Sequence, residues 1–348
     1  MSASQNLASQ IATILESAGL PATIRSIKAC VPGGNNRTYR VTTPNGVFAA
    51  KQYFRHIGDT RARLASEFAF LVYAKKVAPG FVPEPIAMDE DSSIAIYEYI
   101  EGRPFKSGDI GIDEVQQAGQ FFLALNQPNS RVDGCTLPIA SEACFSIKDH
   151  IHLIDRKLAR LNDISPVDAE DRYAVAFIAK LTAKWKELAA GISAEAVALR
   201  LDPLRVLEAG ERCISPSDFG FHNALRDAKG NIRFLDFEYA GWDDPAKMIG
   251  DFFAQIAVPV PQEMFELFLE RCAERFSHPT ELIERARLLR SASLVKWCCI
   301  VLNVFFPVNI ERRHFANPDL DATALKRKQC AKALSIFHFL ETRSHGLY

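Results

Sequence analysis

The sequence predicts an α+β protein of two lobes, in which a small antiparallel sheet with one helix precedes a larger, mostly helical region. Short runs of β-branched and aromatic residues alternate with turn signals over the first hundred residues, whereas helical spacing of apolar residues dominates from residue 113 onward. The chain has 348 residues, 48% of them hydrophobic, so each lobe has enough apolar side chains for an ordinary core. We expect the small lobe over residues 1–100 and the large lobe over residues 101–348.

The small lobe is expected to begin with a helix over residues 8–18 that ends at Gly19. The Pro44-Asn45-Gly46 turn indicates a hairpin, because Asn-Gly tolerates positive φ. A second helix, over residues 60–76, is expected to stop at Pro79-Gly80. The expected strands are residues 24–31, 38–42, 47–54, 83–88 and 93–100. Together they predict a five-stranded antiparallel sheet with one packed helix.

The large lobe should be helical except for one loop-rich segment, residues 212–241, which contains a hairpin of residues 224–226 and 232–236. The expected helices are residues 113–126, 147–161, 168–188, 262–276, 280–305 and 322–341. Loops held by a rigid scaffold often carry function, so residues 212–241 are where we look for a site.

Composition narrows the function classes. The net charge of −1 gives no general basic field for nucleic acid. No apolar run reaches the ~20 residues that cross a bilayer, and the start of the chain lacks the pattern of a signal peptide. None of the eight cysteines forms a C-x-x-C pair, which disfavours a zinc site. We therefore expect a cytoplasmic protein with reduced cysteines, and neither a nucleic-acid nor a membrane partner.

Three polar residues in the loop-rich segment suggest metal chemistry. Asp218 and Asn223 lie five residues apart, and Asp236 follows at the end of a predicted strand. If the hairpin forms, it brings Asn223 and Asp236 side by side at its open end. Mg²⁺ prefers one or two carboxylates together with the oxygens of a phosphate substrate, so this arrangement suits it.

The pattern D-x-x-x-x-N followed by L-D-F-E-x-x-G-x-x-D-P resembles the aminoglycoside phosphotransferase and choline kinase group of the protein-kinase-like superfamily. The resemblance covers about residues 24–345 and is strongest over residues 214–251. It implies a bilobal protein-kinase-like fold, with the first lobe binding the nucleotide and the second carrying the catalytic and acceptor-binding groups. It also implies that Asp218 is the catalytic base and that Asn223 and Asp236 bind Mg²⁺.

The resemblance extends to the first lobe. Lys51, in A-A-K-Q-Y, matches the lysine that binds the α- and β-phosphates of ATP, and Glu67 matches its ion-pair partner. The segment V-P-G-G-N-N-R-T-Y-R-V resembles the nucleotide loop, which places Gly34 and Asn36 at the phosphates. The segment after the fifth strand resembles the hinge, where the backbone of Glu98 and Ile100 would bind the purine.

The loop before the base departs from the family pattern. Pro216 and Ser217 replace the usual His-Gly pair, and Gly220 replaces the histidine two residues after the aspartate. His222 stands beside Asn223 instead. The proton-accepting and metal-binding positions keep the family's residues.

Each residue also has a purely structural interpretation. Lys51 could be a solvated strand lysine, Asp218 and Asn223 could form turns, and Asp236 could cap a helix. Asp243 and Asp244 are expected to cap the helix that reaches Asp251, a structural residue in the family. His222 is expected to bond locally, and Trp242 and Trp297 to pack in the core rather than line an acceptor pocket. The order and spacing of the motif residues nevertheless favour function, because the structural interpretations require several coincidences.

We therefore expect an ATP-dependent kinase acting on a hydroxyl of a small metabolite such as a sugar, an amino alcohol or an aminoglycoside-like compound. The alternative from another class is a nucleotide-binding pseudokinase acting as a scaffold. A protein kinase fits less well, since no D-F-G and A-P-E activation segment is present. The helices over residues 147–192 are expected to shape the acceptor site. The sequence leaves open the acceptor, the preference for ATP or GTP, and the oligomeric state.

Overall fold

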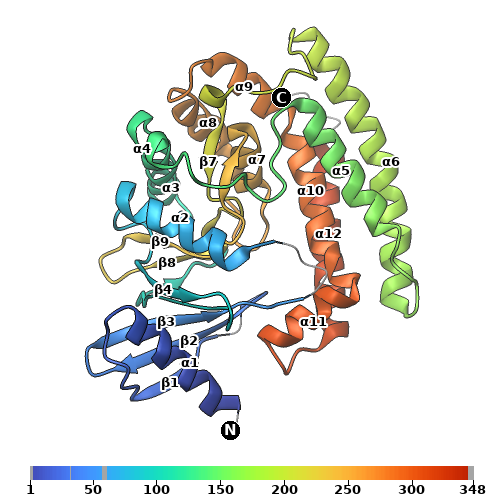
Figure 1. Ribbon diagram of the computed structural model, residues 1–348. Helices are drawn as coiled ribbons and strands as arrows, with labels where there is room; N and C mark the ends of the chain where they lie inside the picture. Colours follow the sequence, from blue (N-terminus) through green and yellow to red (C-terminus); the bar gives the residue numbers. More distant parts are fainter. Residues whose placement is uncertain (1–2, 32, 57–60, 344–348) are drawn as a thin grey trace.

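The computed structural model describes residues 3–31, 33–56 and 61–343 of the chain. It has an α+β architecture of two lobes, with a five-stranded antiparallel sheet at the bottom of Figure 1 and a larger helical part above it. The strands are β1 (Ser26–Ala29), β2 (Arg37–Thr43), β3 (Gly46–Gln52), β4 (Pro85–Asp89) and β5 (Ile94–Glu98). Their spatial order is β1-β2-β3-β5-β4. This confirms the predicted fold class.

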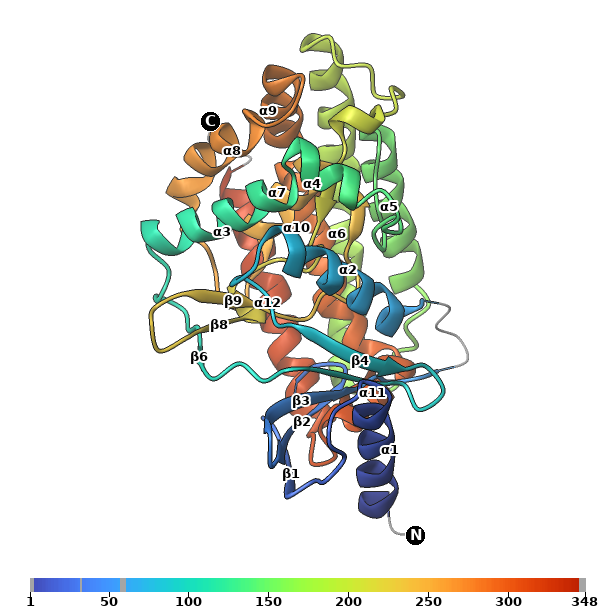
Figure 2. The ribbon, with the colours of Figure 1, turned by 60° about the vertical axis from the view of Figure 1, so that its left-hand side comes forward.

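The two faces of the sheet pack against different helices because side chains alternate along each strand. Ile94 and Ile96 of β5 belong to a small apolar cluster with Ile11 and Leu15 of α1 (Ala3–Ser17). Ala95 and Tyr97 face the other way and join the main core together with α2 (Arg63–Val77). Figure 2 shows α1 lying along the outer side of the sheet.

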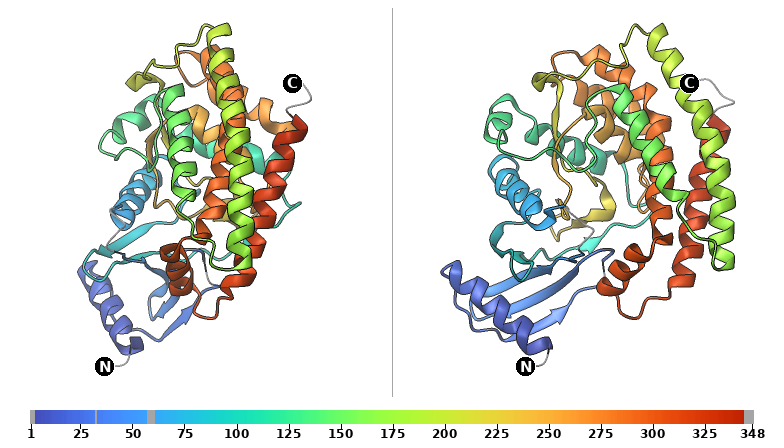
Figure 3. Two further views of the ribbon diagram at one scale, coloured as in Figure 1. Left: turned by 90° about the vertical axis from the view of Figure 1, so that its right-hand side faces the viewer. Right: turned by 45° about the vertical axis from the view of Figure 1, so that its right-hand side comes forward.

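The helical lobe packs around a central helix, α10 (Arg290–Leu302). It contacts α5 (Ile147–Leu161), α6 (Ala169–Ala198), α7 (Pro245–Ala254) and α12 (Ala322–Arg343). Figure 3 shows α5, α6, α10 and α12 side by side. The remaining helices are α3 (Ile112–Leu125), α4 (Pro128–Asp133), α8 (Phe265–Ala273), α9 (Pro279–Leu288) and α11 (Pro307–Ala316).

Short strands frame the loop-rich segment. β7 (Cys213–Ser215) pairs with β10 (Gly241–Asp243), while β6 (Arg103–Pro104), β8 (Ala224–Arg226) and β9 (Ile232–Phe234) form a three-stranded sheet in that order. The predicted hairpin is therefore present, and both of its ends are tied to the helical lobe.

Three helix predictions need correction. The helix predicted over residues 168–188 starts at Ala169 and continues to Ala198. The segment 280–305 is not one helix, because the chain turns by 49° at Leu289 between α9 and α10. The predicted helix over residues 262–276 contains a 3-10 turn, Gln262–Met264, before α8. In the latter two segments the apolar spacing continues through the break, so periodicity alone does not reveal it.

The described cysteines are all free thiols. Cys135 is exposed and Cys30 half-buried, while the other six are buried. Within residues 3–31, 33–56 and 61–343 no single helix is long and apolar enough to span a bilayer, although the bent pair of α9 with the helix that follows it passes that test by length and composition.

Candidate active site

The loop after β7 holds Asp218 in a fixed orientation. Asn223 Nδ2 donates to the backbone oxygen of Asp218 at 3.0 Å and to its Oδ2 at 3.2 Å. His222 Nε2 lies 3.2 Å from Asp218 Oδ1. The local bond expected for His222 is therefore made to the carboxylate itself, and this contact braces a loop that lacks the family's usual histidines.

The charge of Asp218 is stabilised by these neighbours. Burial disfavours the charged carboxylate, but His222, Asn223 and the Lys296 ammonium outweigh it and lower the pKa of Asp218 below its ordinary value. Asp218 is thus ionised at neutral pH and able to accept a hydrogen bond or a proton from an alcohol.

Alternating phenylalanines anchor the same loop in the core. Phe219 and Phe221 are buried on either side of Gly220, and both rings pack against Phe252 of α7, with centroids 4.9 and 5.6 Å away. Ser217, just before Asp218, adopts a left-handed φ of 61° and donates its hydroxyl to the backbone oxygen of Tyr239 at 2.8 Å. The polar residues are therefore positioned by apolar neighbours in the sequence.

The hairpin brings Asp236 to the same place. The N–H of Leu235 donates to the backbone oxygen of Asn223 at 2.8 Å, which joins the end of β9 to the loop of Asp218. Asp236 then adopts a left-handed φ of 65°, which is uncommon for a residue with a Cβ atom. Its side chain points toward the sheet lobe, where Oδ1 contacts Lys51 Nζ at 2.5 Å.

Lys51, Glu67 and Asp236 form one buried cluster between the lobes. Lys51 Nζ lies 2.6 Å from Glu67 Oε2, so α2 and β3 meet in an ion pair. Glu67 also accepts hydrogen bonds from the hydroxyl of Tyr53 at 2.6 Å and from the N–H of Phe237 at 3.2 Å. The structure thus brings together the lysine, the glutamate and the aspartate predicted from the motifs.

Burial shifts the pKa values within this cluster. It disfavours the Lys51 ammonium, but the carboxylates of Asp236 and Glu67 prevail and raise the pKa of Lys51 well above its ordinary value. For Asp236 burial prevails over the attraction of Lys51, and its pKa rises to about 6. A cation bound beside Asp236 would favour its charged form and lower its pKa.

The donor set fits a magnesium ion. Among the described residues, Lys51 is the only hydrogen-bond partner of the Asp236 carboxylate, at Oδ1, and Asn223 uses its amide N–H rather than its Oδ1 in side-chain bonds. One carboxylate oxygen and one amide oxygen are therefore open to a ligand. Mg²⁺ usually binds through such hard oxygens together with water and phosphate.

The predicted nucleotide loop is tied to a residue that the motif analysis gave no role, Glu238. Asn36 Nδ2 donates to Glu238 Oε2 at 3.0 Å, and Asn35 Nδ2 donates to Oε1 at 3.1 Å. Asn36 Oδ1 in turn accepts the N–H of Phe54 at 3.2 Å. The side chain of Asn36 thus links the two lobes by hydrogen bonds. Gly34 lies against the Arg313 guanidinium, and a Cβ atom there would collide with it.

The predicted hinge residues lie at the end of β5, away from this cluster. The N–H of Glu98 donates to the backbone oxygen of Glu84 at 2.8 Å, so this N–H is already used within the protein. The Glu98 carboxylate accepts from Arg233 Nη2 at 3.0 Å. Ile100 follows two residues beyond the strand. Purine binding by these residues stays a prediction.

A buried charge network lies beneath the loop. Asp244 caps α7 by accepting the N–H of Ala246 at 2.8 Å, and it pairs with Arg285 at the same distance. Asp243 pairs instead with Lys247 at 2.6 Å. Asp251 contacts both Lys247, at 3.7 Å, and Lys296. The structural role expected for Asp251 agrees with these contacts, although Asp244 alone is the cap.

The two tryptophans lie on different sides of this region. Trp242 donates Nε1 to the backbone oxygen of Gly134 at 3.1 Å and is half-buried. Trp297 of α10 is more deeply buried and meets the His222 ring edge-on, with centroids 6.1 Å apart. Trp297 therefore packs against the loop that carries Asp218.

Comparison with known proteins agrees with this geometry. The sequence pattern of the phosphotransferase enzyme family, abbreviated APH, matches residues 26–256, which is more than half of the chain. The chain belongs to the phosphotransferase enzyme family. This membership makes it a small-molecule kinase, a phosphotransferase with an alcohol group as acceptor.

Solved structures of similar fold include enzymes with different acceptors. A choline kinase from Cryptosporidium parvum Iowa II superposes with a TM-score of 0.61 at 13% identity, covering 98% of this chain and 97% of that one. A choline kinase from Streptococcus pneumoniae gives 0.55 at 15% identity, covering 95% and 99%. A spectinomycin phosphotransferase in complex with ADP and spectinomycin gives 0.54 at 11% identity, covering 93% and 98%. At these identities the likeness establishes the fold alone. No protein with a curated description matches the chain.

Proposed function

We propose that this phosphotransferase transfers the γ-phosphoryl group of ATP to a hydroxyl of a small metabolite. The observation that carries the proposal is the junction of Lys51 and Asp236 across the lobes, with Asn223 and Asp218 next to it on one loop. Phosphoryl transfer depends mainly on positioning and on neutralising charge, and these four side chains offer both.

Each residue has a distinct role in the proposal. Lys51, held by Glu67, binds the α- and β-phosphates below the loop of Gly34 and Asn36. Asp218 accepts the hydrogen bond of the acceptor hydroxyl and aims its oxygen at the γ-phosphorus. Asn223 and Asp236 would hold Mg²⁺, which neutralises charge on the phosphates.

The lobes have matching roles. We propose that residues 1–100 bind the nucleotide, with the backbone of Glu98 and Ile100 facing the purine. Residues 101–348 would provide the catalytic loop and the acceptor site. The ADP in the spectinomycin phosphotransferase of the same fold supports the use of an adenine nucleotide.

The test is a screen of alcohols and sugars for stimulated ADP release, with the mass of each product measured. We expect one class of compound to gain one phosphoryl group in the presence of Mg²⁺. Asp218→Ala should lower this turnover by about 10²–10⁴-fold, the usual range for a positioned acid–base group.

Asp227→Ala is the matched control, because Asp227 lies on the same hairpin and, within the described part of the chain, its carboxylate accepts hydrogen bonds only from the turn residues Lys229 and Asn231. Its turnover should equal that of the parent. Equal turnover in Asp218→Ala and the parent would contradict the proposed mechanism and favour a nucleotide-binding scaffold.

A further inference from the structure

Helix α11 joins the two lobes at the edge of the proposed site. Arg37 Nε of β2 donates to the backbone oxygen of Phe315 at 2.5 Å, and the ring of Phe315 lies 5.4 Å from that of Phe54. Two residues earlier on α11, the Arg313 guanidinium lies against Gly34 in the nucleotide loop. In Figure 1, α11 lies beside the ends of β2 and β3. Its arginines are therefore placed next to the position of the phosphates.

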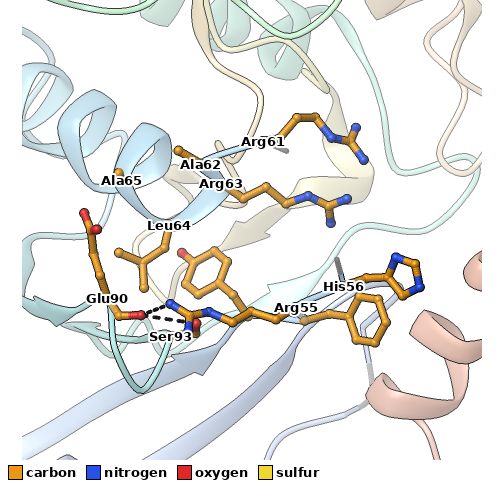
Figure 4. Close-up of a pocket in the computed structure, with 11 residues that line it drawn as sticks. Arg55, His56, Arg61, Ala62, Arg63, Leu64, Ala65, Glu90 and Ser93 are labelled. Carbon is orange, nitrogen blue, oxygen red and sulfur yellow. Dashed lines mark hydrogen bonds between the residues drawn. The ribbon is translucent and has the colours of Figure 1, made fainter. Parts of the chain in front are cut away.

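Several cations crowd around Tyr239 in this region. The guanidinium carbons of Arg61 and Arg63 lie 5.3 and 5.5 Å from the Tyr239 ring centre, and Figure 4 shows both side chains extending in the same direction from the start of α2. Burial lowers the pKa of Arg312, and the nearby charges of Arg63 and Arg313 lower it further. The guanidinium groups around Tyr239 therefore repel one another, and burial further disfavours the charge of Arg312.

Among the described residues, no carboxylate forms an ion pair with Arg312 or Arg313. Glu238 pairs with Arg63 at 3.8 Å and accepts hydrogen bonds from Asn35 and Asn36. Arg312 donates to the neutral Asn309 at 2.5 Å, while its buried Nε has no acceptor. Across residues 3–31, 33–56 and 61–343 the Arg313 guanidinium makes no hydrogen bond or ion pair. Guanidinium groups in such a place fit a bound anion, because they are planar, forked donors for phosphate and carboxylate.

The position of Arg313 indicates which anion this is. Burial lowers its pKa, whereas the nearby charges of Tyr239 and Asp218 raise it. Its guanidinium lies against Gly34, so it is next to the nucleotide loop and close enough to the proposed base to interact with its charge. Lys51 and the metal already neutralise the nucleotide phosphates in the proposed mechanism. A second anion near Asp218 would therefore belong to the acceptor substrate, whose hydroxyl Asp218 orients.

We propose that the acceptor of this kinase carries an anionic group, a phosphate or a carboxylate, and that Arg313 of α11 binds it near Asp218 while Arg312 adds positive charge next to Arg313. The proposal rests on the proposed kinase function and names the class of its acceptor. It separates this chain from kinases of ammonium-bearing acceptors, since the guanidinium groups would repel a positively charged substrate.

Inorganic phosphate is the first probe, because it tests anion binding without turnover. The full chain is saturated with Mg²⁺ and a non-hydrolysable ATP analogue, so that the nucleotide position is filled, and is titrated with phosphate in a calorimeter. We expect saturable binding to the parent, at least about tenfold weaker binding to Arg313→Gln, and an intermediate affinity in Arg313→Lys, which keeps the charge without the fork. Arg271→Gln, on the exposed side of α8, should bind as the parent does.

Thermal unfolding of each variant shows whether it is folded, and Arg313→Lys keeps the test open if the glutamine variant is not. Equal phosphate affinity in the parent and in both folded Arg313 variants would overturn the proposal. Binding that disappears once the ATP analogue is present would also overturn it, since the arginines would then serve the nucleotide. These results do not depend on turnover, so they are separate from a failure of the kinase reaction itself.

A matched acceptor series gives the second readout. ADP release is compared with glucose, glucose 6-phosphate, gluconate and glucosamine, which share a carbon skeleton and differ in charge. We expect the anionic members to stimulate release more than glucosamine does, and Arg312→Gln to raise the KM for the anionic member with little change in the KM for ATP. Stronger stimulation by glucosamine would contradict the proposal.

Discussion

At the scale of single residues, the site depends on a few side chains held in uncommon conformations. Ser217 and Asp236 both have left-handed φ values, of 61° and 65°, and they flank the two ends of the proposed catalytic segment. A non-glycine residue in this region costs about 1–3 kcal/mol when the structure must enforce it. The sheet, the loop and the buried phenylalanines supply the packing that keeps these residues in place.

His222 is expected to position Asp218 rather than to react. Since its ring lies 3.2 Å from the Asp218 carboxylate, His222→Ala should allow that carboxylate to rotate and lower kcat by about tenfold, or ~1.4 kcal/mol, with little change in the KM for ATP. Steady-state kinetics at saturating ATP measures this difference.

His222→Gln is the matched variant, because its amide can donate to the same oxygen and should recover part of the loss. A parallel rise in the KM for ATP would show that His222 supports the fold of the cleft instead.

Gly241 of β10 is a position that only glycine fits. Its φ is 157°, and a Cβ atom would meet the backbone of Pro138, Ile139 and Ala140. Gly241→Ala should therefore lower the free energy of unfolding by at least about 1–3 kcal/mol. The urea midpoint measures this change.

Gly210→Ala serves as the control, since a Cβ atom there meets nothing within 4 Å and its φ is not in the left-handed region. The urea midpoint of this variant should stay within a few tenths of a molar of that of the parent. Equal effects at both positions would contradict the steric argument.

At the scale of elements, one residue at the N-terminus of α7, Asp244, both caps the helix and forms a buried ion pair. Asp244 accepts the N–H of Ala246 and pairs with both Arg285 and His150. Burial disfavours its charge, but Arg285 and His150 prevail and hold the pKa of Asp244 well below its ordinary value. A carboxylate with a depressed pKa stabilises the folded state above the pKa of the unfolded chain, ~3.9, and loses that contribution as the pH falls through the folded value.

Asp244→Asn should accordingly destabilise the protein by about 3–5 kcal/mol at pH 7, because it leaves a buried guanidinium without its partner. The difference from the parent should shrink as the pH falls below about 4, and denaturant titrations at several pH values measure it. Asp319→Asn, at an exposed position, should show no such dependence on pH. A constant difference across the pH range would contradict the ion-pair explanation.

The elements also show what sequence reasoning could and could not recover. The five strands and α2, α3, α5 and α12 follow from periodicity and from turn residues such as Asn45-Gly46, because each forms its own local pattern. Helix α11 was not predicted, because its apolar face is short. Its contacts with the sheet lobe join residues far apart in the sequence, such as Arg37 and Phe315, and leave no local pattern. Likewise, Glu238 belongs to the quoted motif, but its role could not be assigned from the sequence because its bonds to Asn35 and Asn36 cross the two lobes.

For the candidate site the outcome is similar. The motif spacing was enough to foresee that Lys51 would meet Glu67 and Asp236, and that Asn223 would meet Asp218. Their catalytic roles stay predictions. The contact of His222 with Asp218 could have been suspected from its spacing of four residues, but the side-chain direction depends on the 3-10 turn Phe221–Asn223.

At the scale of the whole molecule, α11 connects the lobes in addition to the Lys51–Asp236 and Asn36–Glu238 contacts, and independently of the chain that links β5 to α3. Phe315 packs on Phe54, and the Arg37 guanidinium lies 4.4 Å from the centre of the Phe315 ring. This contact should help to set how far the cleft opens.

Phe315→Ala should lower kcat/KM for ATP by about tenfold, because the nucleotide loop would lose its support from α11, while the melting temperature changes by only a few degrees. Phe339→Ala on α12 is the control, since that ring packs against the main core. It should lower the melting temperature without changing the KM for ATP. The reverse pattern would show that α11 serves stability alone.

The distribution of the thiols has a practical consequence for studying this molecule. With Cys135 exposed, Cys30 half-buried and six sulfurs enclosed, a mild alkylating reagent should modify the folded protein at one or two positions and reach the rest only when the core opens. Burial also raises the pKa of enclosed sulfurs such as Cys144, which keeps them as poorly reactive thiols until then. Counting added labels by mass spectrometry over time would thus report how often each layer of the interior is exposed, without any introduced probe.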